Sequence, residues 1–583
     1  SGFILNNVTL NGGIEHGVNL TLSSAGSSGG VINVIGSGVL NATMTETLMK
    51  TGIENVTQID ITGISLSGSG DDWINDYTGT KGGGWIFNNA HVNKSGNISL
   101  KGVGFVNSTL TATNLTLTNE NTPISLTNTS LQATNGNVTL QGVNLVNSSV
   151  TANGNLTIDN KDQGLLLQSS TLNSTGGNIS LSVNSSAADT YGGIKLINTN
   201  LSADSGDINV SAVSKKTYGP TGVWLLQKGG LVISGNNNFS ARNSQFSGTI
   251  SSGEGDFVGA IYIKSSSSPT SINITGNATF TGKDTANQKT GIYTPLQGAN
   301  INVSNGNLTL NGSGWNGFST APVNGQYADS GMRFVLSNAN VTINAKGTNE
   351  GIGKLGNAND PSGLTFRGVG NVTVNAVGIS GSGIRTNKLD NSGLTGSTVI
   401  TGESKAGGKG IFITDNIIVH LTNATVTGKS ATGEGVTVNA LGKGAYGSDI
   451  SISGGTLTGE SAGAAAGVNI TGKNVNVSGG ANLTGSSAAG GDGVKLNVTA
   501  GNNYTLDGAT VTGTSMSGSG VNISGALNAT GTTNITGNTT TGNGVNISGN
   551  LTSTGNSVTV SGTSGIGTGL SISGNNVTIT NGT

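Results

Sequence analysis

The sequence predicts an all-β fold, a right-handed parallel β-helix of about 20 to 25 residues per coil with extra-helical loops. Short strand motifs recur at nearly constant spacing. Within them Val, Ile and Leu alternate with Asn, Ser and Thr, the period of two that turns one face inward. Of the 583 residues, 100 are Gly and only 33% are hydrophobic. A thin apolar column flanked by ladders of polar side chains can form a core from so few apolar residues.

The first repeat is the strand motif N-[IVL]-[ST]-[LI] between residues 97 and 181, with a mean spacing of about 20 residues. A second motif lies between its copies, as in NSTLTA from Asn107 and NSSVTA from Asn147. A third apolar segment, such as ISL from Ile124, completes a unit of three strands. Gly and Asn turns separate the strands, which favours short strands over helices. The first motif begins at Asn97, Asn114, Asn137, Asn155 and Asn178.

A different repeat, G-[VIL]-x-[IVL]-x, runs through the C-terminal part with most steps near about 25 residues. We therefore expect four regions in one continuous solenoid that is a fragment of a larger protein. They are irregular coils with an aromatic loop at 67–87 in residues 1–96, regular coils of about 20 residues in 97–192, coils with long insertions in 193–382, and regular coils of about 25 residues in 383–583.

The charge and composition exclude several classes of function. Because 25 Lys and Arg balance 27 Asp and Glu without a basic stripe, we expect no nucleic-acid partner, and without a long apolar run we expect no membrane insertion. The absence of Cys excludes disulfides and thiolate metal sites. The three His are isolated, and the one dense carboxylate group, Asp71, Asp72 and Asp76, lacks the spacing of a calcium loop. The sequence therefore predicts no catalytic residue, no metal and no cofactor.

Three aromatic interruptions of the repeat, at 67–87, 218–230 and 311–334, hold all four Trp. Flat Trp and Tyr faces stack on sugars or on side chains of a partner, and nearby Asp can bond hydroxyl groups. The alternative is that each loop folds back and pins itself through its aromatic residues. The candidate ligand-binding residues are Trp73, Tyr77 and Trp85 with Asp71, Asp72 and Asp76, and Trp315, Phe318 and Tyr327.

The most frequent chemical motif is N-x-[ST], the acceptor sequence for N-glycosylation, which roughly forty Asn residues carry. The same pattern also arises where a strand opens with Asn at a turn and alternates with Val or Leu, because Thr then falls two positions on. We expect glycosylation at a subset only. The candidates are Asn7, Asn97, Asn114, Asn137, Asn155, Asn307, Asn522 and Asn546.

The N-[IVL]-[ST]-[LI] coils, with their TLTA and GNLTL segments, the dense N-x-[ST] motifs and the lack of Cys, resemble the filamentous-haemagglutinin-like repeat shaft of two-partner secretion exoproteins of the high-molecular-weight adhesin type (EtpA-like). The resemblance implies a secreted or surface-displayed bacterial adhesin that attaches to host-cell glycans or glycoproteins. Its partners would be an outer-membrane two-partner transporter and a cytoplasmic N-glycosyltransferase. The NPNG-type secretion motif of the family is absent here, so the resemblance covers the shaft.

Two alternatives remain open from the sequence. Related shafts carry toxins in contact-dependent inhibition systems, and the repeats do not separate that use from adhesion. Some parallel β-helices degrade polysaccharides with clustered carboxylates, which is the enzymatic alternative.

Overall fold

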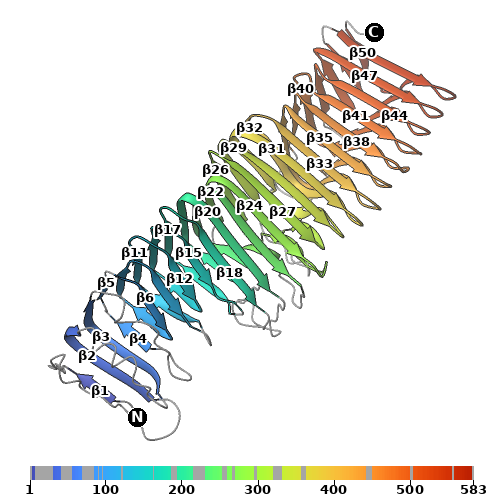
Figure 1. The fold of residues 1–583 in the computed structure, drawn as a ribbon. Helices are drawn as coiled ribbons and strands as arrows, with labels where there is room; N and C mark the ends of the chain where they lie inside the picture. The colour runs from blue at the N-terminus through green and yellow to red at the C-terminus, as the bar shows by residue number, and fades with distance from the viewer. Residues whose placement is uncertain are drawn as a thin grey trace, which may run out of the picture. The chain divides into compact units, whose positions relative to one another are not determined.

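The computed structural model describes residues 3–6, 30–40, 56–68, 85–88, 91–94, 96–119, 123–161, 163–185, 193–214, 230–251, 259–264, 269–294, 298–319, 331–355, 363–440, 449–498, 503–554 and 557–580. These residues form strands β1 to β52 and no helix (Figure 1). The part of the chain that is described therefore contains no helical segment able to span a membrane.

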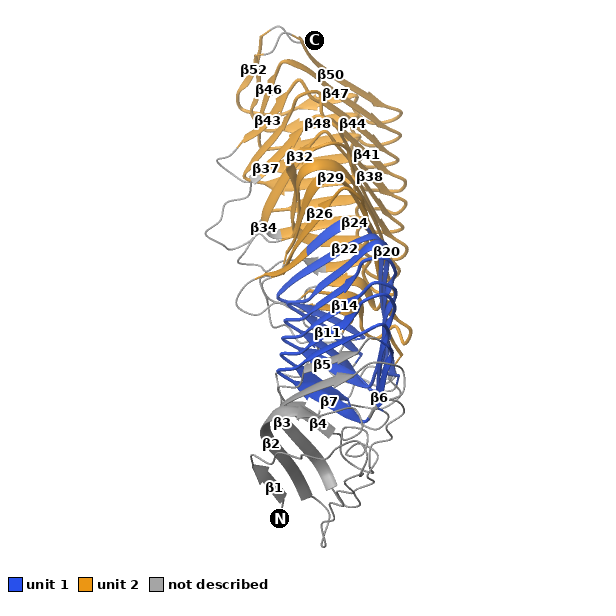
Figure 2. Cartoon of the chain, turned by 60° about the vertical axis from the view of Figure 1, so that its left-hand side comes forward, with its two compact units in different colours: residues 1–249, 273–277 blue, residues 250–272, 278–583 orange. Residues whose placement is uncertain are grey.

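The chain divides into two compact units, drawn in different colours in Figure 2. Unit 1 comprises residues 1–249 and 273–277, and unit 2 comprises residues 250–272 and 278–583. The pairings between neighbouring coils are parallel in both units. The prediction of an all-β parallel β-helix is confirmed.

Most strands of unit 1 have four residues, but two near its beginning and three toward its end are longer. The final residue of its last strand, Ile250, belongs to unit 2. The first five are β1 (Phe3–Asn6), β2 (Gly30–Leu40), β3 (Val56–Gly68), β4 (Trp85–Asn88) and β5 (His91–Lys94); then come β6 (Ile98–Lys101), β7 (Val103–Val106), β8 (Thr109–Ala112), β9 (Leu115–Thr118), β10 (Ile124–Thr127), β11 (Ser130–Ala133), β12 (Val138–Gln141), β13 (Val143–Val146), β14 (Ser149–Ala152), β15 (Leu156–Asp159), β16 (Leu165–Gln168), β17 (Thr171–Ser174), β18 (Ile179–Ser185), β19 (Ile194–Ile197), β20 (Asn200–Ser214), β21 (Leu231–Ser234) and β22 (Asn236–Ile250).

Three strands make one coil in the regular part of unit 1, because β10 pairs with β13, β11 with β14 and β12 with β15. The step from one coil to the next is 19 residues between Ser130 and Ser149 and 23 between Asn155 and Asn178. Near the end of the unit the step rises to 38, between Asn200 and Asn238. The expected coil length is therefore found in the regular coils and is exceeded near the end of the unit.

The core of these coils is a stack of identical positions. Leu110, Leu131, Val150, Leu172 and Leu201 lie in register on successive strands, and each is at most 1% exposed. Alternation explains the stack, since every second residue of a strand points to the same face. Each apolar side chain thus packs on its equivalents in the coils before and after it.

The turn that precedes these strands explains the second sequence motif. Its first residue adopts the left-handed conformation in Asn107, Asn128, Asn147 and Asn198, with φ between 49° and 51°. Asn tolerates this conformation better than other residues with a Cβ, because its short polar side chain can bond locally. The motif begins with Asn because the corner of the coil requires that backbone geometry.

The residue after each of these four Asn is a buried Ser or Thr. Ser148 is 5% exposed, and the single hydrogen of its hydroxyl lies between two acceptors, the carbonyl oxygens of Leu126 at 3.0 Å and Val146 at 2.8 Å. The same hydroxyl oxygen accepts a hydrogen bond from the backbone amide of Thr129 at 3.0 Å. The hydroxyls thereby satisfy backbone groups that the corner would otherwise leave unpaired inside the coil.

The strands of unit 2 follow the same plan. They are β23 (Gly259–Lys264), β24 (Thr270–Asp284, whose residues 273–277 belong to unit 1), β25 (Thr290–Tyr293), β26 (Ala299–Ser304), β27 (Asn307–Gly314), β28 (Asn316–Ser319), β29 (Met332–Gly347), β30 (Ile352–Leu355), β31 (Leu364–Gly378), β32 (Ile384–Thr395), β33 (Thr398–Ser404), β34 (Ile411–Thr422), β35 (Ala424–Ser430), β36 (Val436–Asn439), β37 (Asp449–Ser453), β38 (Thr456–Ser461), β39 (Val468–Gly472), β40 (Asn474–Ser478), β41 (Asn482–Ser487), β42 (Val494–Val498), β43 (Asn503–Asp507), β44 (Thr510–Ser515), β45 (Val521–Ser524), β46 (Ala526–Thr530), β47 (Thr532–Thr539), β48 (Val545–Ser548), β49 (Leu551–Ser553), β50 (Ser557–Ser564), β51 (Leu570–Ile572) and β52 (Val577–Ile579).

The C-terminal coils of unit 2 carry an inward-facing Gly where two strands of one coil converge. A Cβ added to Gly485 would lie 2.0 Å from the carbonyl oxygen of Gly493, and one added to Gly513 would lie 1.8 Å from that of Gly520. Real Cβ atoms do not approach backbone oxygens so closely, so this corner admits only Gly. The Gly whose carbonyl oxygen makes this close approach is the first residue of the repeat G-[VIL]-x-[IVL]-x, as in Gly493 and Gly520.

A Ser or Thr two residues after the inward Gly closes the corner. The hydroxyl of Ser515 donates to the carbonyl oxygen of Gly491 at 2.6 Å and accepts from the amide of Gly518 at 2.9 Å. The hydroxyl of Thr539 repeats the donor contact one coil later, to Gly518 at 2.8 Å. The inward Gly and the Ser or Thr two residues after it are therefore the strand residues on which this corner depends.

Candidate functional site

Only some of the candidate ligand-binding residues belong to the part of the chain that the structure describes. Asp71, Asp72, Trp73, Asp76, Tyr77 and Tyr327 lie outside the described residues. Trp85 opens β4, where its backbone is in register with Ile59 of β3 and Val103 of β7.

Two candidates of the third aromatic segment are separated by the structure. Trp315 lies between β27 and β28 and is 46% exposed, whereas Phe318 of β28 is 2% exposed. Phe318 stacks in register between Ile292 and Ile352, inside the coil. The Phe318 ring is a core residue that no surface ligand reaches, and Trp315 is the member that a partner could contact.

The N-x-[ST] asparagines of unit 1 form a ladder along the coils. The backbone amide of Asn137 donates to Oδ1 of Asn114 at 2.8 Å, that of Asn155 to Asn137 at 2.7 Å, and that of Asn178 to Asn155 at 2.8 Å. The first rung differs, since Nδ2 of Asn114 donates to Oδ1 of Asn97 at 2.8 Å. In the later rungs Oδ1 of one Asn accepts a hydrogen bond from the backbone amide of the next Asn, and Nδ2 is not one of the two bonded atoms.

The ladder also explains the Gly that precedes many of these asparagines. A Cβ on Gly136 would lie 1.9 Å from Oδ1 of Asn114, and one on Gly154 would lie 2.3 Å from Oδ1 of Asn137. The dipeptide Gly-Asn therefore leaves room for the amide of the preceding rung. The structural interpretation of the repeated Asn is correct for these positions, and it leaves the glycosylation prediction open.

The other described candidates lie in two ladders of unit 2. Nδ2 of Asn340 donates to Oδ1 of Asn307 at 2.8 Å, and Nδ2 of Asn546 donates to Oδ1 of Asn522 at 3.1 Å. Nδ2 of Asn522 donates in turn to Asp492 at 2.9 Å. Here the side-chain nitrogen itself makes the contact. Asn7 lies outside the described residues.

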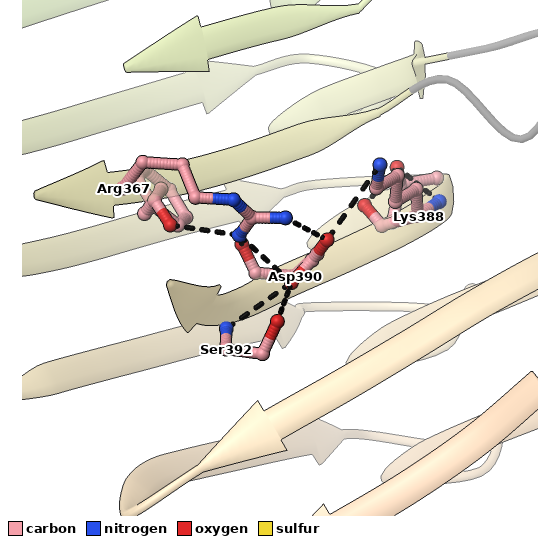
Figure 3. Close-up of polar contacts among 6 residues, drawn as sticks. Arg367, Lys388, Asp390 and Ser392 are labelled. Carbon is pink, nitrogen blue, oxygen red and sulfur yellow. Dashed lines mark hydrogen bonds and ion pairs between the residues drawn. The ribbon is translucent and has the colours of Figure 1, made fainter. Parts of the chain in front are cut away.

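A charged cluster of unit 2, shown in Figure 3, was missed by the sequence reasoning. Asp390 is 3% exposed, and its carboxylate accepts Nη1 of Arg367 at 2.9 Å and Nη2 at 2.5 Å. The hydroxyl of Ser392 donates at 2.8 Å, and Nζ of Lys388 lies 3.6 Å away. Burial alone would raise the pKa of the Asp390 carboxyl, but the hydrogen bonds from Arg367 and Ser392 outweigh it and hold that pKa well below its usual range.

The cluster lies where the strand register changes. The pairing of β31 with β32 shifts between Thr365 and Arg367, and that of β32 with β34 shifts between Thr386 and Lys388. Irregular pairing leaves polar groups that must be satisfied by side chains. The bidentate pair of Arg367 and Asp390 satisfies polar groups at this irregular pairing. We therefore interpret the cluster as a structural contact that stabilises the corner rather than as a reactive site.

The sequence carried one usable signal for this cluster. Arg367 and Asp390 are 23 residues apart, which is close to one coil, so stacked coils bring them together.

A second charged group surrounds a partly exposed aromatic ring on β34. Nζ of Lys409 lies 4.2 Å from the ring centroid of Phe412, and Cζ of Arg385 lies 5.9 Å from it. Each cation also has a carboxylate partner, Glu434 at 3.3 Å from Lys409 and Glu350 at 3.8 Å from Arg385. The ring and its charges form a polar surface stripe, with both cations already paired.

Within the described residues no group of three or more acidic or His side chains is placed to hold a metal ion. The comparisons with known proteins add no homologue: no family model matches the chain, and no curated protein matches it.

Proposed function

We propose that this chain is the repeat shaft of a secreted or surface-displayed bacterial adhesin that attaches to host cells by binding cell-surface glycans or glycoproteins. The observation that supports this most is the stacking of the outward asparagine ladder, which presents the same polar group on coil after coil. A repeated surface suits binding that is weak per site and gains strength from many simultaneous contacts. Export through an outer-membrane two-partner transporter belongs to the same proposal.

We also propose that a cytoplasmic N-glycosyltransferase modifies part of the N-x-[ST] motifs. Attachment of a sugar to Nδ2 leaves Oδ1 free to accept a hydrogen bond. In Asn137 and Asn155 the ladder uses Oδ1, so a sugar at these positions is compatible with the stacking. A low charged fraction of 9% adds a reason for modification, since attached sugars would improve solubility.

Intact mass of the protein from its native source tests the glycosylation part. A mass above that of the unmodified polypeptide, 57.5 kDa for these 583 residues, is expected in steps of one hexose. A mass equal to that of the bare chain would overturn this part of the proposal.

Cell attachment tests the adhesion part. The full chain should bind cultured epithelial cells, and Trp315→Ala should reduce binding, because Trp315 is the described aromatic candidate that is exposed. Met516→Ala is a matched control, since Met516 is also a large exposed side chain of unit 2, 57% exposed. Equal binding by wild type, Trp315→Ala and Met516→Ala would remove Trp315 from the contact surface, and absence of binding by wild type would overturn adhesion.

The same preparation separates the alternatives. Growth inhibition of neighbouring bacteria by a longer native form would indicate a toxin-delivery shaft, and cleavage of a polysaccharide would indicate an enzyme. Either result would contradict the proposal of an adhesin without catalysis.

A further inference from the structure

The C-terminal coils of unit 2 carry an uncharged array of hydroxyl and amide side chains on one outward sheet face. The threonine array consists of the outward residues of β41, β44, β47 and β50, strands that run side by side in Figure 1. Its members are Asn482, Thr484, Ser486, Thr510, Thr512, Thr514, Asn534, Thr536, Asn538, Thr559, Ser561 and Thr563.

The register makes this face a lattice of columns. Thr484, Thr512 and Thr536 lie opposite one another on successive strands, and Thr458 of β38 continues the column. The columns repeat at about 4.8 Å across the strands, and the rows repeat at about 6.7 Å along them, two residues at a time. The lattice is held from below by buried residues, of which Val511 is 0% exposed.

Each Thr offers a hydroxyl that donates and accepts, beside a methyl group. Because Thr is branched at Cβ, few rotamers are open to a stacked side chain, so the hydroxyls have defined positions. A rigid array of this kind holds its bound water molecules in a matching array rather than in random positions. The oxygen repeats of ice lie close to both spacings of the lattice.

The charge of the face selects among partners. None of the members of the array is ionisable, and the ion pair of Glu460 with Lys429 lies at its edge, so the array itself is matched to a neutral surface. It also contains no aromatic ring on which a sugar could stack. A flat neutral lattice of donors and acceptors is what an ice surface presents.

We propose that the threonine array of unit 2 binds ice, by holding water molecules in positions continuous with the ice lattice. This binding is separate from the proposed attachment to cells and does not depend on it. Asn482, Asn534 and Asn538 all open N-x-[ST] motifs, so a sugar at any of these three members of the array would block the face.

The test is partition of the full unmodified chain, made without a glycosyltransferase, between slowly growing ice and the remaining solution. Wild type should be enriched in the ice, and Thr512→Lys should lose that enrichment, because it places a charge at the centre of the array. Thr505→Lys is the matched control: it makes the same change in the same coil, on a column formed with Asn476 and Asn528. Unchanged thermal unfolding of both variants would show that the loss comes from the surface.

Three results would overturn the proposal. They are exclusion of wild type from ice, equal partition of wild type and Thr512→Lys, and elution of wild type as a dimer that Thr512→Lys converts to monomer. The last would identify the array as a contact between two copies. Binding of wild type to crystalline cellulose without enrichment in ice would likewise replace ice by a polysaccharide as the partner.

Discussion

The regular coils of unit 1 and the C-terminal coils of unit 2 solve one problem in two ways. Both must turn a corner after a short strand without leaving backbone groups unpaired. Unit 1 uses a left-handed Asn followed by a buried Ser or Thr, as at Asn147 and Ser148. Unit 2 uses an inward Gly and a Ser that bonds turn glycines, as at Gly513 and Ser515.

The inward position just before the corner shows the difference most clearly. In unit 1 it is often Ala, as in Ala133 and Ala152, and these side chains are 2% and 0% exposed. In unit 2 the inward position before the glycine corner, which lies on a different column of strands, is Gly, because the opposing backbone lies within 2.0 Å of where a Cβ would be in Gly485 and Gly513. The lesson is that the separation of the converging strands, rather than local propensity, chooses between Ala and Gly.

The largest loss of stability is expected when an inward Gly of unit 2 is replaced by Ala. Gly513→Ala should lower the free energy of unfolding by about 3 kcal/mol, because the added Cβ meets the carbonyl oxygen of Gly520 at 1.8 Å and overpacks the corner. Gly407→Ala is the control, since its Cβ would have no atom within 4 Å. Urea unfolding followed by circular dichroism measures both. If the two variants have equal midpoints, steric exclusion does not explain the Gly column.

The next largest effect is expected in the Asp390 cluster. Asp390→Asn should cost about 2 to 3 kcal/mol, because it leaves the Arg367 guanidinium without its charged partner at a site where Asp390 is 3% exposed. Glu403→Gln is the control, since its pair with Lys405 is at the surface and should be worth under about 1 kcal/mol. Equal losses for the two variants would show that burial adds nothing to the clamp.

The same pair predicts a pH dependence of stability. Since the folded-state pKa of Asp390 is held below its ordinary value of about 3.9, its stabilisation is complete above that pH and is lost as the pH falls below it. The difference in urea midpoint between wild type and Asp390→Asn should therefore be larger at neutral pH than near pH ~3. A difference that stays constant or grows on acidification would contradict the assignment.

A smaller effect is expected in the corner of unit 1. Ser148→Ala should cost about 1 to 2 kcal/mol, because the amide of Thr129 and the carbonyl of Leu126 lose a buried partner. Ser149→Ala is the neighbouring control, since the Ser149 hydroxyl makes a partly buried side-chain contact with Ser130 at 3.1 Å. Thermal unfolding should rank Ser148→Ala below Ser149→Ala, and the reverse order would count against the buried hydroxyl ladder.

The smallest effect tests the left-handed Asn itself. Asn147→Ala should cost about 1 kcal/mol, and Asn147→Gly should cost less, because Gly takes a φ of 49° without a steric penalty. Comparing the two melting temperatures isolates the backbone contribution. Should Asn147→Gly be the less stable variant, the side chain rather than the conformation would be what the corner requires.

The sequence by itself determined the all-β repeat, the strand motifs and the alternation, because a period of two and a recurring spacing are properties of the chain alone. It also supported both explanations of the asparagines, and the ladder of Asn114, Asn137 and Asn155 shows the structural one at work. The inward Gly of the C-terminal strands, such as Gly513, could not be explained without the backbone that touches it.

Only the tertiary structure decided contacts between residues about one coil apart. It joined Arg367 to Asp390, placed Phe318 in the core and left Trp315 exposed, because stacking brings together positions whose separation depends on the length of each coil. It likewise aligned Thr484, Thr512 and Thr536 into one column. Coil lengths vary from 17 to 38 residues, so this register follows from packing of the coils and not from a fixed count along the chain.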